Sequence, residues 1–563
     1  MAGTEQDDTP EIALSNRLDE PSIGPAWLAV VAGALLGLLT FFAVGATHTL
    51  SPSRVGWLFD TADPSTHYLG WCFFRQDAWR WPLGINPKYG MEMGSSIVYS
   101  DSIPLMAMVF KPFSQWMGDD FQYTGIWLLL CLLLQGVWAM LLMRQLNKHL
   151  LLQVLGAAFL VIPVVLLKRL EGHYALAGQW IVLWAICHHV KGRGRSGPLT
   201  AGRTWAIIAA LAALIHLYLA AMVIAIWQAD VLREWMAGRR RPRALLGEYA
   251  IVLGTMLVAM WMVGYFAIGF GDSRTPGTAG AYSMNLLGPL DSRGFSRFLP
   301  ALPLDRPGQE EGTCYLGLGM ILLAGIVVCH RAIPRQSSQI SGQLLIVCAV
   351  ITLFALSPIL TLGRWRILES PNYWGFVGEI FRASGRVIWP AYYVFFLVVI
   401  AATIRRFPTR TAGWLLAAML VVQVADLSPL FVKLQEHFAA SPTIASPLKD
   451  PFWEKAGQKY KCILIMRPDG TDVDWLGLGR IAAQHRMAIS YGYFARSNWN
   501  LRQAADQERL NALRRGSVDP DALYVVCDEK VMDQIRATLP ADAWAGEVDG
   551  IRVIAPGFQS ISN

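Results

Sequence analysis

Long apolar stretches separated by short polar segments make up most of residues 26–432. Windows such as Ala26–Ala46, Ile126–Met143 and Tyr249–Phe270 contain almost no charged residue. Each window is close to the roughly 20 residues that a helix needs to cross a bilayer. The pattern therefore predicts a mostly α-helical fold, a polytopic bundle of transmembrane helices.

The same pattern predicts about eleven spans. They lie near residues 26–48, 124–143, 151–167, 174–190, 204–215, 218–236, 248–269, 315–330, 343–362, 387–404 and 412–431. The stretch Trp205–Trp227 has the length of one span, but basic residues flank it on both sides, at 191–203 and at 233–243. Because basic segments stay on the cytoplasmic side, a single crossing would leave one cluster outside. We therefore expect two short helices that turn near His216 and Tyr218.

Loop charge also predicts the orientation of the whole chain. The acidic, polar segment 1–25 lacks the basic start of a cleaved signal peptide and is expected to be a cytoplasmic tail. The large loops 50–123, 271–314 and 363–386 then lie outside, and residues 26–432 form one membrane domain. In a bacterial inner membrane, which we expect for this chain, the outside is the periplasm.

The last part of the chain, residues 433–563, changes to a mixed pattern of short strands and helices. Expected strands are Lys461–Met466, Ala522–Cys527 and Gly550–Ile554, and expected helices are Asp474–His485 and Val531–Thr538. No phosphate-binding glycine loop or ligand cluster stands out. We predict a small periplasmic α/β domain that acts as a structural cap or guides an acceptor.

Composition and charge exclude several classes of protein. Hydrophobic residues make up 54% of the chain and charged residues only 16%, whereas soluble domains are about one quarter charged. The net charge of +7 comes from basic clusters between apolar spans, where they orient a membrane protein rather than bind nucleic acid. A nucleic-acid binder, a secreted disulfide-rich protein and a cytosolic enzyme are therefore excluded.

The first outer loop is the richest place for catalytic side chains. Asp63 follows the first span closely and is expected at the outer surface of the membrane. Asp60 is the nearby alternative for the same role. His67 is one helical turn beyond Asp63, so the two side chains share a face. A carboxylate beside an imidazole can take a proton from a hydroxyl or bind a metal ion. Alternatively, Asp63 followed by Pro64 caps a helix, and His67 is a hydrogen-bonded structural residue.

Other outer segments carry an acid and a set of arginines. Asp101 precedes an apolar segment and is either a second acid of the same site or another helix cap. Arg169 lies in a tight turn between two spans, and Arg382 and Arg386 are four residues apart on one helical face. Guanidinium groups bind phosphate oxygens with two hydrogen bonds. The alternative is that these arginines only reach toward water at helix ends.

A third group of outer residues offers hydroxyl, amide, carboxylate and imidazole groups for sugar hydroxyls. These candidates for sugar or acceptor binding are Glu171, His173, Tyr282, Asn285 and Glu310. For any single one of them, ordinary loop packing is the alternative. Carboxylates, arginines and aromatic rings on one face suit transfer of a sugar from a polyprenyl phosphate. We expect the loop 50–123 and the turn near Arg382 to border one common outer cavity.

Six segments of the chain form a distinctive set: DPSTHYLGWCFFR, YSDSIPL, LEGHYAL, YSMNLLGPLD, YLGLG and FRASGRVIWP. Together they resemble the GT-C class of membrane glycosyltransferases, and more closely a bacterial family of multi-pass proteins near that class. The resemblance covers about residues 26–432. It implies a GT-C-like fold and a lipid-linked sugar donor, with the first-loop acid matching Asp63 best and a second acid matching Asp101. It assigns no metal ligands, since some GT-C enzymes need a divalent cation such as Mg²⁺ or Mn²⁺ and others do not.

The sequence therefore predicts an inverting glycosyltransferase that moves a sugar from a polyprenyl-phosphate donor to a glycan, lipid or protein acceptor at the periplasmic face. Asp63 is the expected base, with His67 and Asp101 in support. Arg382 and Arg386 are the expected phosphate clamp. The alternatives are a transporter or flippase for a lipid-linked saccharide, and a non-catalytic partner in polysaccharide assembly.

Overall fold

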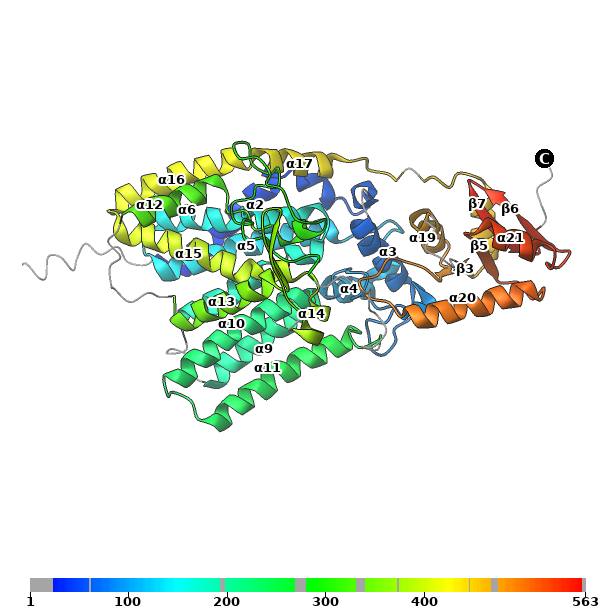
Figure 1. The fold of residues 1–563 in the computed structure, drawn as a ribbon, viewed down its shortest axis with the longest axis horizontal. Helices are drawn as coiled ribbons and strands as arrows, with labels where there is room; N and C mark the ends of the chain where they lie inside the picture. The colour runs from blue at the N-terminus through cyan, green and yellow to red at the C-terminus, as the bar shows by residue number, and fades with distance from the viewer. Residues whose placement is uncertain are drawn as a thin grey trace, which may run out of the picture.

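The computed structural model describes residues 24–59, 62–192, 198–268, 280–330, 340–371, 374–444, 446–466 and 474–558. It contains a long helical bundle and, at one end of it, a C-terminal domain with a β-sheet (Figure 1). The helices α3 (Ala62–Gln76) and α4 (Pro104–Phe110) lie between these two parts. The mostly helical fold with a small C-terminal sheet agrees with the sequence prediction.

Each of the eleven apolar segments contains an α-helix in the described part of the chain. These helices are α2 (Ala26–Ala43), α5 (Thr124–Leu146), α6 (Leu150–Val161), α8 (Trp180–Lys191), α9 (Pro198–Ile215), α10 (Leu217–Met236), α11 (Pro242–Met262), α12 (Leu318–Cys329), α13 (Gly342–Leu356), α15 (Trp389–Arg406) and α16 (Thr409–Asp426). The apolar pattern therefore located the helices, although their ends differ by several residues in places.

The predicted number of about eleven spans is larger than the number of helices that are long and apolar enough to cross a membrane. Within the described residues, four helical segments are long and apolar enough to cross a membrane: Ala26–Ala43, Thr124–Leu146, Pro242–Met262 and Ser384–Arg406. The number rises to six if two bent pairs each count as one span. The pairs are α6 with the segment Val164–Glu171, bent by 45°, and α16 with α17 (Ser428–Ala439), bent by 52°. Other apolar helices, such as α12, are too short for a full crossing.

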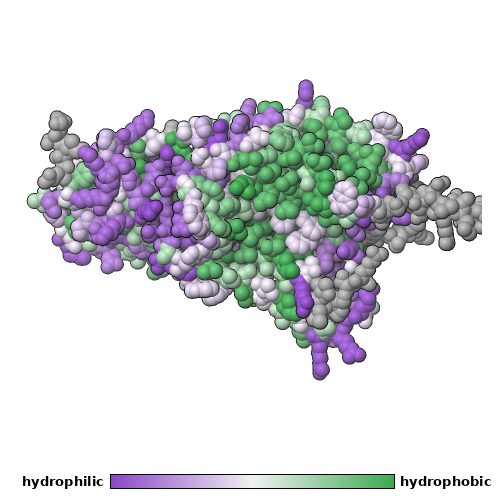
Figure 2. Space-filling model, turned by 180° about the vertical axis from the view of Figure 1, so that it is seen from behind, coloured by the Kyte–Doolittle hydropathy of each residue, from purple (hydrophilic) through white to green (hydrophobic). Residues whose placement is uncertain are grey.

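The surface of the bundle is apolar where a membrane would surround it. Figure 2 shows a broad hydrophobic band over the helices and a hydrophilic surface at the end that carries the C-terminal domain. Large side chains such as Leu39, Val328 and Trp414 are more than half exposed. Exposed apolar area of this extent is typical of lipid-facing helices. Together with the long apolar helices, it indicates a membrane protein.

The predicted break near His216 is confirmed. The helix α9 ends at Ile215, and His216 has an extended backbone before α10 begins at Leu217. Its imidazole Nδ1 accepts a hydrogen bond from the Tyr218 amide at 3.1 Å. The two helices fold back on each other, since the Trp205 indole near the start of α9 donates to Asp230 near the end of α10 at 2.9 Å. A hairpin of this kind brings both helix ends next to the basic loops to one side, as loop charge predicts.

Short helices and one pair of strands connect the longer helices of the bundle. They are the short helices α7 (Val164–Leu167), η5 (Lys168–Glu171), η6 (Tyr174–Ala177), η7 (Gln309–Gly312), α14 (Gly375–Ile380) and η8 (Ser384–Ile388), and the antiparallel strands β1 (Ile359–Leu362) and β2 (Trp365–Glu369). These elements come from loops that are far apart in the sequence. They supply most of the polar side chains described below.

The C-terminal domain has a five-stranded sheet in the order β4-β3-β5-β7-β6. Its strands are β3 (Cys462–Met466), β4 (Ala488–Ile489), β5 (Ala522–Val526), β6 (Ala543–Val548) and β7 (Ile551–Pro556), and its helices are α18 (Phe452–Lys459), α19 (Trp475–Gln484), α20 (Trp499–Arg514) and α21 (Glu529–Arg536). The strands β3, β4 and β5 pair in parallel, whereas β7 pairs antiparallel with β5 and β6. The three predicted strands and two predicted helices are present. The sequence pattern missed α18, α20, β4 and β6.

The helices α2 and α5 cross closely because glycine lies at the contact. A Cβ atom at Gly136 would lie 2.0 Å from the carbonyl oxygen of Gly33, which leaves no room for a methyl group. Small residues at such a crossing let two backbones approach. We expect Gly136→Ala to lower the free energy of unfolding by about 1–3 kcal/mol, measured by thermal unfolding in detergent. The matched change Gly325→Ala on α12, where a Cβ meets no atom within 4 Å, should not destabilise the protein; equal losses would contradict the close crossing.

Candidate active site

Polar side chains from six separate segments meet at the end of the bundle near the C-terminal domain. The segments are the first turns of α3, the loop 98–103, the turn 168–173, the break between α9 and α10, and the pair η7 and η8. The first outer loop and the segment before α15 therefore meet, because Asp63 contacts His173 and His173 contacts Arg386. These contacts join parts of the chain more than 200 residues apart.

Asp63 and His67 lie one turn apart at the start of α3, as predicted, but they bond to different partners. The Asp63 carboxylate lies 3.5 Å from His173 Nε2 and is 38% exposed. The His67 imidazole is almost fully buried, and its Nε2 lies 3.3 Å from an oxygen of Asp101. Asp63 thus pairs with His173 instead of the expected His67, which pairs with Asp101. Asp63 is the more exposed of the two acids.

Asp101 is held beside α3 by a tightly packed loop. The Ser102 hydroxyl donates to the carbonyl of His67 at 2.7 Å, and the loop can approach because a Cβ at Gly70 would lie 2.1 Å from the Ser100 hydroxyl. Asp101 has a left-handed backbone, with φ of 53°, a conformation that costs energy outside glycine. The alternative role as a helix cap does not apply, since Ile103 is the N-cap of α4. The carboxylate is instead aimed at His67 and, at 3.5 Å, at His216 Nε2.

Burial and charge separate the two acids of the site. Burial raises the pKa of Asp63 above its usual range. His67 and Arg386 lower this pKa, but their effect is smaller than that of burial. Burial would also raise the pKa of Asp101, but attraction to His216 and His67 outweighs burial and holds that pKa at about 2. Asp101 is therefore a permanent anion, whereas Asp63 exchanges its proton nearer to neutral pH. Such a separation is typical of acid–base sites.

Both remaining histidines are kept neutral. Burial lowers the pKa of His216 to about 4, although Asp101 opposes this. Burial lowers the pKa of His173 well below its ordinary value, and the positive charges of Arg386 and Arg169 lower it further. A neutral imidazole has one unprotonated ring nitrogen, which can accept a proton or bind a cation. In His216 that nitrogen is already used, because Nδ1 accepts from the Tyr218 amide.

A group of cations lies next to the acids and shares one carboxylate. Arg169 and Arg386 each lie 2.8 Å from the same oxygen of Glu311, and Arg386 also lies 3.0 Å from His173 Nε2. The Lys168 ammonium donates to the backbone carbonyl of Glu310. Two arginines thus share one acid, and Lys168 adds a third cation beside them, so positive charge exceeds negative charge in this group. These four charged groups, Lys168, Arg169, Arg386 and Glu311, are called the basic cluster below.

Arg382 lies apart from the basic cluster. It lines a small hollow with seven other residues: Gly280, Phe354, Ser357, Pro358, Trp374, Gly378 and Ser384. Its guanidinium makes no ion pair with a carboxylate in the described part of the chain, whereas Arg386 pairs with Glu311. The two arginines of the predicted clamp are therefore separate groups. Arg386 is paired with a carboxylate, whereas Arg382 has no carboxylate partner among the described residues and is called the available arginine below.

Three side chains of the site have the donor chemistry of a metal centre. His67, Asp101 and His173 each offer one ligand atom, and these atoms lie within 4.8 Å of one another. Two imidazoles and a carboxylate are a common ligand set for divalent transition metals. The neutral state of His173 suits this use, because a protonated imidazole cannot bind a metal.

The remaining predicted residues lie at different distances from this centre. The Glu171 carboxylate pairs with Lys433 of α17 at 3.0 Å. Tyr282 lies beside the site, since its carbonyl accepts a hydrogen bond from the amide of Gly385 at 3.1 Å. Asp60 lies outside the described residues. The sugar-binding roles of Glu171 and Tyr282 stay predictions.

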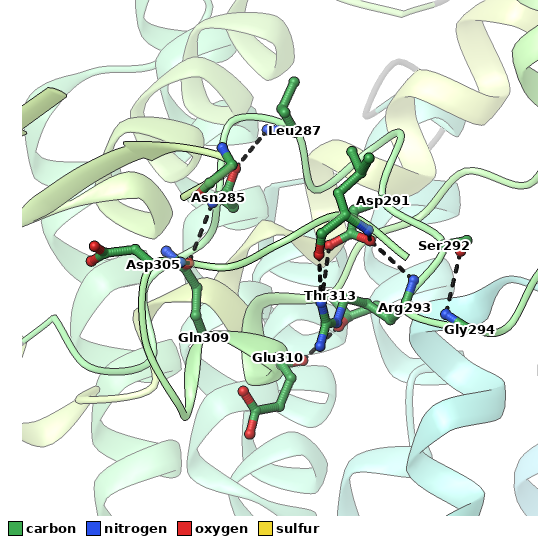
Figure 3. Close-up of polar contacts among 12 residues, drawn as sticks. Asn285, Leu287, Asp291, Ser292, Arg293, Gly294, Asp305, Gln309, Glu310 and Thr313 are labelled. Carbon is green, nitrogen blue, oxygen red and sulfur yellow. Dashed lines mark hydrogen bonds and ion pairs between the residues drawn. The ribbon is translucent and has the colours of Figure 1, made fainter. Parts of the chain in front are cut away.

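Asn285 and Glu310 belong to the outer loop that Figure 3 shows. The Asn285 amide donates to Thr361 at 3.0 Å and to Gly363 at 2.8 Å, and its oxygen accepts from Leu287 at 3.0 Å. These bonds use its polar atoms to hold the loop, which leaves none for a sugar hydroxyl in this conformation. The Glu310 carboxylate points away from the neighbouring Thr313 contact (Figure 3). Both predicted sugar-binding roles stay predictions.

Three residues of the site were not among the predicted ones. His216 was predicted only as a helix break, Glu310 was selected instead of Glu311, and Lys168 was not selected. A signal existed for His216, because a histidine at membrane depth is costly unless it has a polar partner. No signal in the sequence separates Glu311 from Glu310, since the two acids are adjacent.

Comparison with known proteins gives a family and a distant structural likeness. Residues 34–428 match a family described as "Domain of unknown function (DUF6311)", and residues 452–556 match its "C-terminal domain". Comparison with curated proteins gives no match. The apo oligosaccharyltransferase of Archaeoglobus fulgidus is similar in structure with a TM-score of 0.41 and 12% sequence identity. That match covers 83% of this chain and 64% of the archaeal one, so the chain spans less than two thirds of that protein's length.

Proposed function

The chain belongs to the DUF6311 family, and we propose that it is a membrane glycosyltransferase that moves a sugar from a polyprenyl-phosphate donor to an acceptor hydroxyl. The observation that carries this proposal is the contact between Asp63, His173 and Arg386. It places an exposed acid with a raised pKa beside an excess of positive charge. Glycosyl transfer from a phosphate needs these two features together, a base for the acceptor and cations for the leaving group.

Asp63 is the base in this proposal. Its carboxylate is the most exposed acid of the site, and its raised pKa brings its proton affinity closer to working pH, where a general base is most effective. An acceptor hydroxyl that hydrogen-bonds to Asp63 loses its proton as its oxygen attacks the anomeric carbon. Attack from the face opposite the phosphate inverts the configuration of the sugar.

The basic cluster stabilises the leaving phosphate in this proposal. As the bond between the anomeric carbon and the phosphate oxygen breaks, negative charge grows on the polyprenyl phosphate. The Nε and Nη2 groups of Arg386 face Glu311 and His173, and His173 borders Asp63. These contacts orient the guanidinium so that its Nη1 group donates to the growing charge. Arg382, without a carboxylate partner among the described residues, serves as a second contact at the edge of the site.

A divalent cation also fits the site. The atoms of His67, Asp101 and His173 would hold it, and two nitrogen ligands favour Mn²⁺ over Mg²⁺, which prefers oxygen. When bound, it would neutralise charge on the donor phosphate. Asp101, an anion held by two imidazoles, keeps these ligands aligned with or without the ion.

We also propose that the site faces the periplasm of a bacterial inner membrane, with the N-terminus in the cytoplasm. In support, the basic residues Arg233, Arg239 and Arg240 lie around the loop between α10 and α11, whereas the site lies by the opposite turn at His216. Basic loops mark the cytoplasmic side. A polyprenyl-phosphate donor in the outer leaflet would then present its head group at the depth of the site.

Mass spectrometry of surface glycans from a deletion strain tests the function. The proposal predicts an exported glycan that lacks a single sugar residue. Loss of all exported glycan would instead identify a transporter or flippase. An intact sugar sequence with reduced chain assembly would identify a non-catalytic assembly partner.

The pH dependence of transfer tests the role of Asp63. The base works only when ionised, so kcat/KM should fall as the pH drops through the pKa of Asp63, at a higher pH than for an ordinary aspartate. The negative charge of Asp101 contributes to this raised pKa. In Asp101→Asn the acidic limb of the residual activity should therefore move to lower pH.

Asp305→Asn is the matched control for that shift. Asp305 pairs with Arg306 and Arg366 away from Asp63, so its loss should leave the acidic limb in place. An acidic limb that stays fixed in Asp101→Asn would rule out Asp63 as the group that titrates.

A further inference from the structure

The segment 489–498 of the C-terminal domain, between β4 and α20, lies against the first outer loop. The carbonyl of Ile489 accepts a hydrogen bond from the amide of Gly90 at 2.9 Å. Six residues later, the amide of Ala495 donates to the carbonyl of Tyr99 at 2.8 Å. The segment is thus fixed at two points to the loop that carries Asp63 and Asp101.

Aromatic packing fixes the middle of the same segment. The ring of Phe494 lies 4.8 Å from the ring of Tyr89, which is fully buried. Gly492 lies so close that an added Cβ would be 2.8 Å from both rings, and Tyr491 is only 8% exposed. Tyr491 and Gly492 are therefore buried and Phe494 is partly buried, whereas Tyr493 itself is 48% exposed.

The backbone of Tyr493 is joined directly to the helix of the proposed base. Its carbonyl accepts a hydrogen bond from the Thr66 hydroxyl at 3.2 Å. Thr66 is three residues beyond Asp63 on α3, so one turn of helix separates this bond from the carboxylate. The C-terminal domain thus contacts the helix of the proposed base at Tyr493, whose backbone is anchored and whose ring is half-exposed.

Electrostatics agrees with this placement. Burial raises the pKa of the Tyr493 phenol, the charge of Asp63 raises it further, and Arg382 opposes the rise. Tyr282 also acts on the same phenol. The phenol is therefore within electrostatic reach of the proposed base, of the available arginine and of the second tyrosine.

We propose that Tyr493 forms the acceptor side of the site, where it and Tyr282 pack against a sugar ring of a glycan acceptor. This inference rests on the proposed function and adds the class of the acceptor and a role for the C-terminal domain. The two tyrosines belong to different segments: Tyr493 lies beside Thr66 of α3, and Tyr282 lies beside Gly385 of η8. An aromatic ring with a polar hydroxyl matches a sugar, which has apolar faces and hydroxyl edges.

The position of the domain favours a glycan over a lipid acceptor. The C-terminal domain lies beyond the end of the apolar bundle (Figure 1), and its surface is hydrophilic (Figure 2). An acceptor that contacts Tyr493 therefore approaches from water, whereas the polyprenyl chain of the donor stays in the bilayer. A lipid acceptor would need an apolar surface at this place.

Binding of surface glycan from the deletion strain tests this proposal. The affinity is measured by microscale thermophoresis on the purified Asp63→Asn protein, in which the acceptor binds without turnover. Adding Tyr493→Ala should raise the Kd about tenfold, the size of one aromatic contact, while Tyr493→Phe should keep the affinity. Trp499→Ala is the matched control, because Trp499 is a similarly exposed ring on α20 that contacts Arg502 instead.

A Kd that Tyr493→Ala leaves unchanged, or a glycan that does not bind at all, would overturn the proposal. Failure of the proposed function looks different. In that case the wild-type protein transfers no sugar, whereas the glycan still binds and Tyr493→Ala still weakens it. A thermal unfolding curve is recorded for each variant, and Tyr493→Ala should unfold at the temperature of the parent protein. A rise in Kd that comes with an equal loss of thermal stability would identify a merely structural residue and overturn the proposal.

Discussion

Asp63→Asn should lower kcat for sugar transfer by about 10³-fold, within the range of about 10²–10⁴ that a general base contributes. Asparagine keeps the size and most of the hydrogen bonding of the side chain but cannot take a proton. The fold should survive, because Asp63 is 38% exposed and its one side-chain partner among the described residues is His173 at 3.5 Å. Steady-state kinetics on purified protein, with a thermal unfolding curve for each variant, measures both effects.

Asp119→Asn is the matched control for Asp63→Asn. Asp119 is an exposed acid of the same outer loop, and its loss should leave kcat unchanged. A normal rate in Asp63→Asn together with a large loss in Asp101→Asn would transfer the role of base to Asp101.

Arg386→Ala should lower kcat by about 10²–10³-fold, the usual cost of removing one donor that stabilises charge in a transition state. The guanidinium donates to Glu311 at 2.9 Å and lies 3.0 Å from His173, so its loss removes the cation nearest to the proposed base. Arg386→Lys should recover part of the rate, because the charge remains but the two-pronged geometry is lost. Kinetics at saturating donor distinguishes the effect on kcat from one on KM.

Arg366→Ala provides the comparison for Arg386→Ala. Arg366 lies on β2 and pairs with Asp305 and Glu369, so its removal should not change kcat. A rise in KM for the donor without any change in kcat would mean that Arg386 only binds the donor and does not stabilise the leaving phosphate.

Much of the helical framework could be predicted from the sequence. Apolar stretches report directly on helices that face lipid, and each predicted segment contains one. Loop charge even located the break at His216, inside a stretch with the length of one span. The number of full spans was overestimated because hydropathy does not report bends, such as the 52° bend between α16 and α17, or helices that end early.

The candidate site could be predicted only in part. Charged residues in outer loops are conspicuous, so Asp63, Asp101, His173 and Arg386 were selected, and the structure brings these four together. Which of these residues contact each other could not be predicted from the sequence. Helical spacing predicts a contact of Asp63 with His67, whereas in the fold Asp63 contacts His173. That contact depends on how α3 packs against the turn after α7, and no local pattern encodes it.

Residues such as Glu311 and Tyr493 illustrate the other limit. Glu311 differs from Glu310 only in its direction on a short helix, which positions one carboxylate between Arg169 and Arg386. Tyr493 is more than 400 residues from Asp63 in the sequence, and only the packing of the C-terminal domain against the first outer loop places it beside the site. Such contacts between distant segments leave no trace in hydrophobic periodicity.

The most direct test is whether the purified protein releases free polyprenyl phosphate from lipid-linked sugars extracted from membranes of the deletion strain. The extract is incubated with surface glycan of the same strain, and the released lipid is measured by mass spectrometry. We expect release with wild-type protein, matched by one added sugar per glycan end, and almost none with Asp63→Asn. No release by a folded wild-type protein, or equal release by both proteins, would contradict sugar transfer at Asp63.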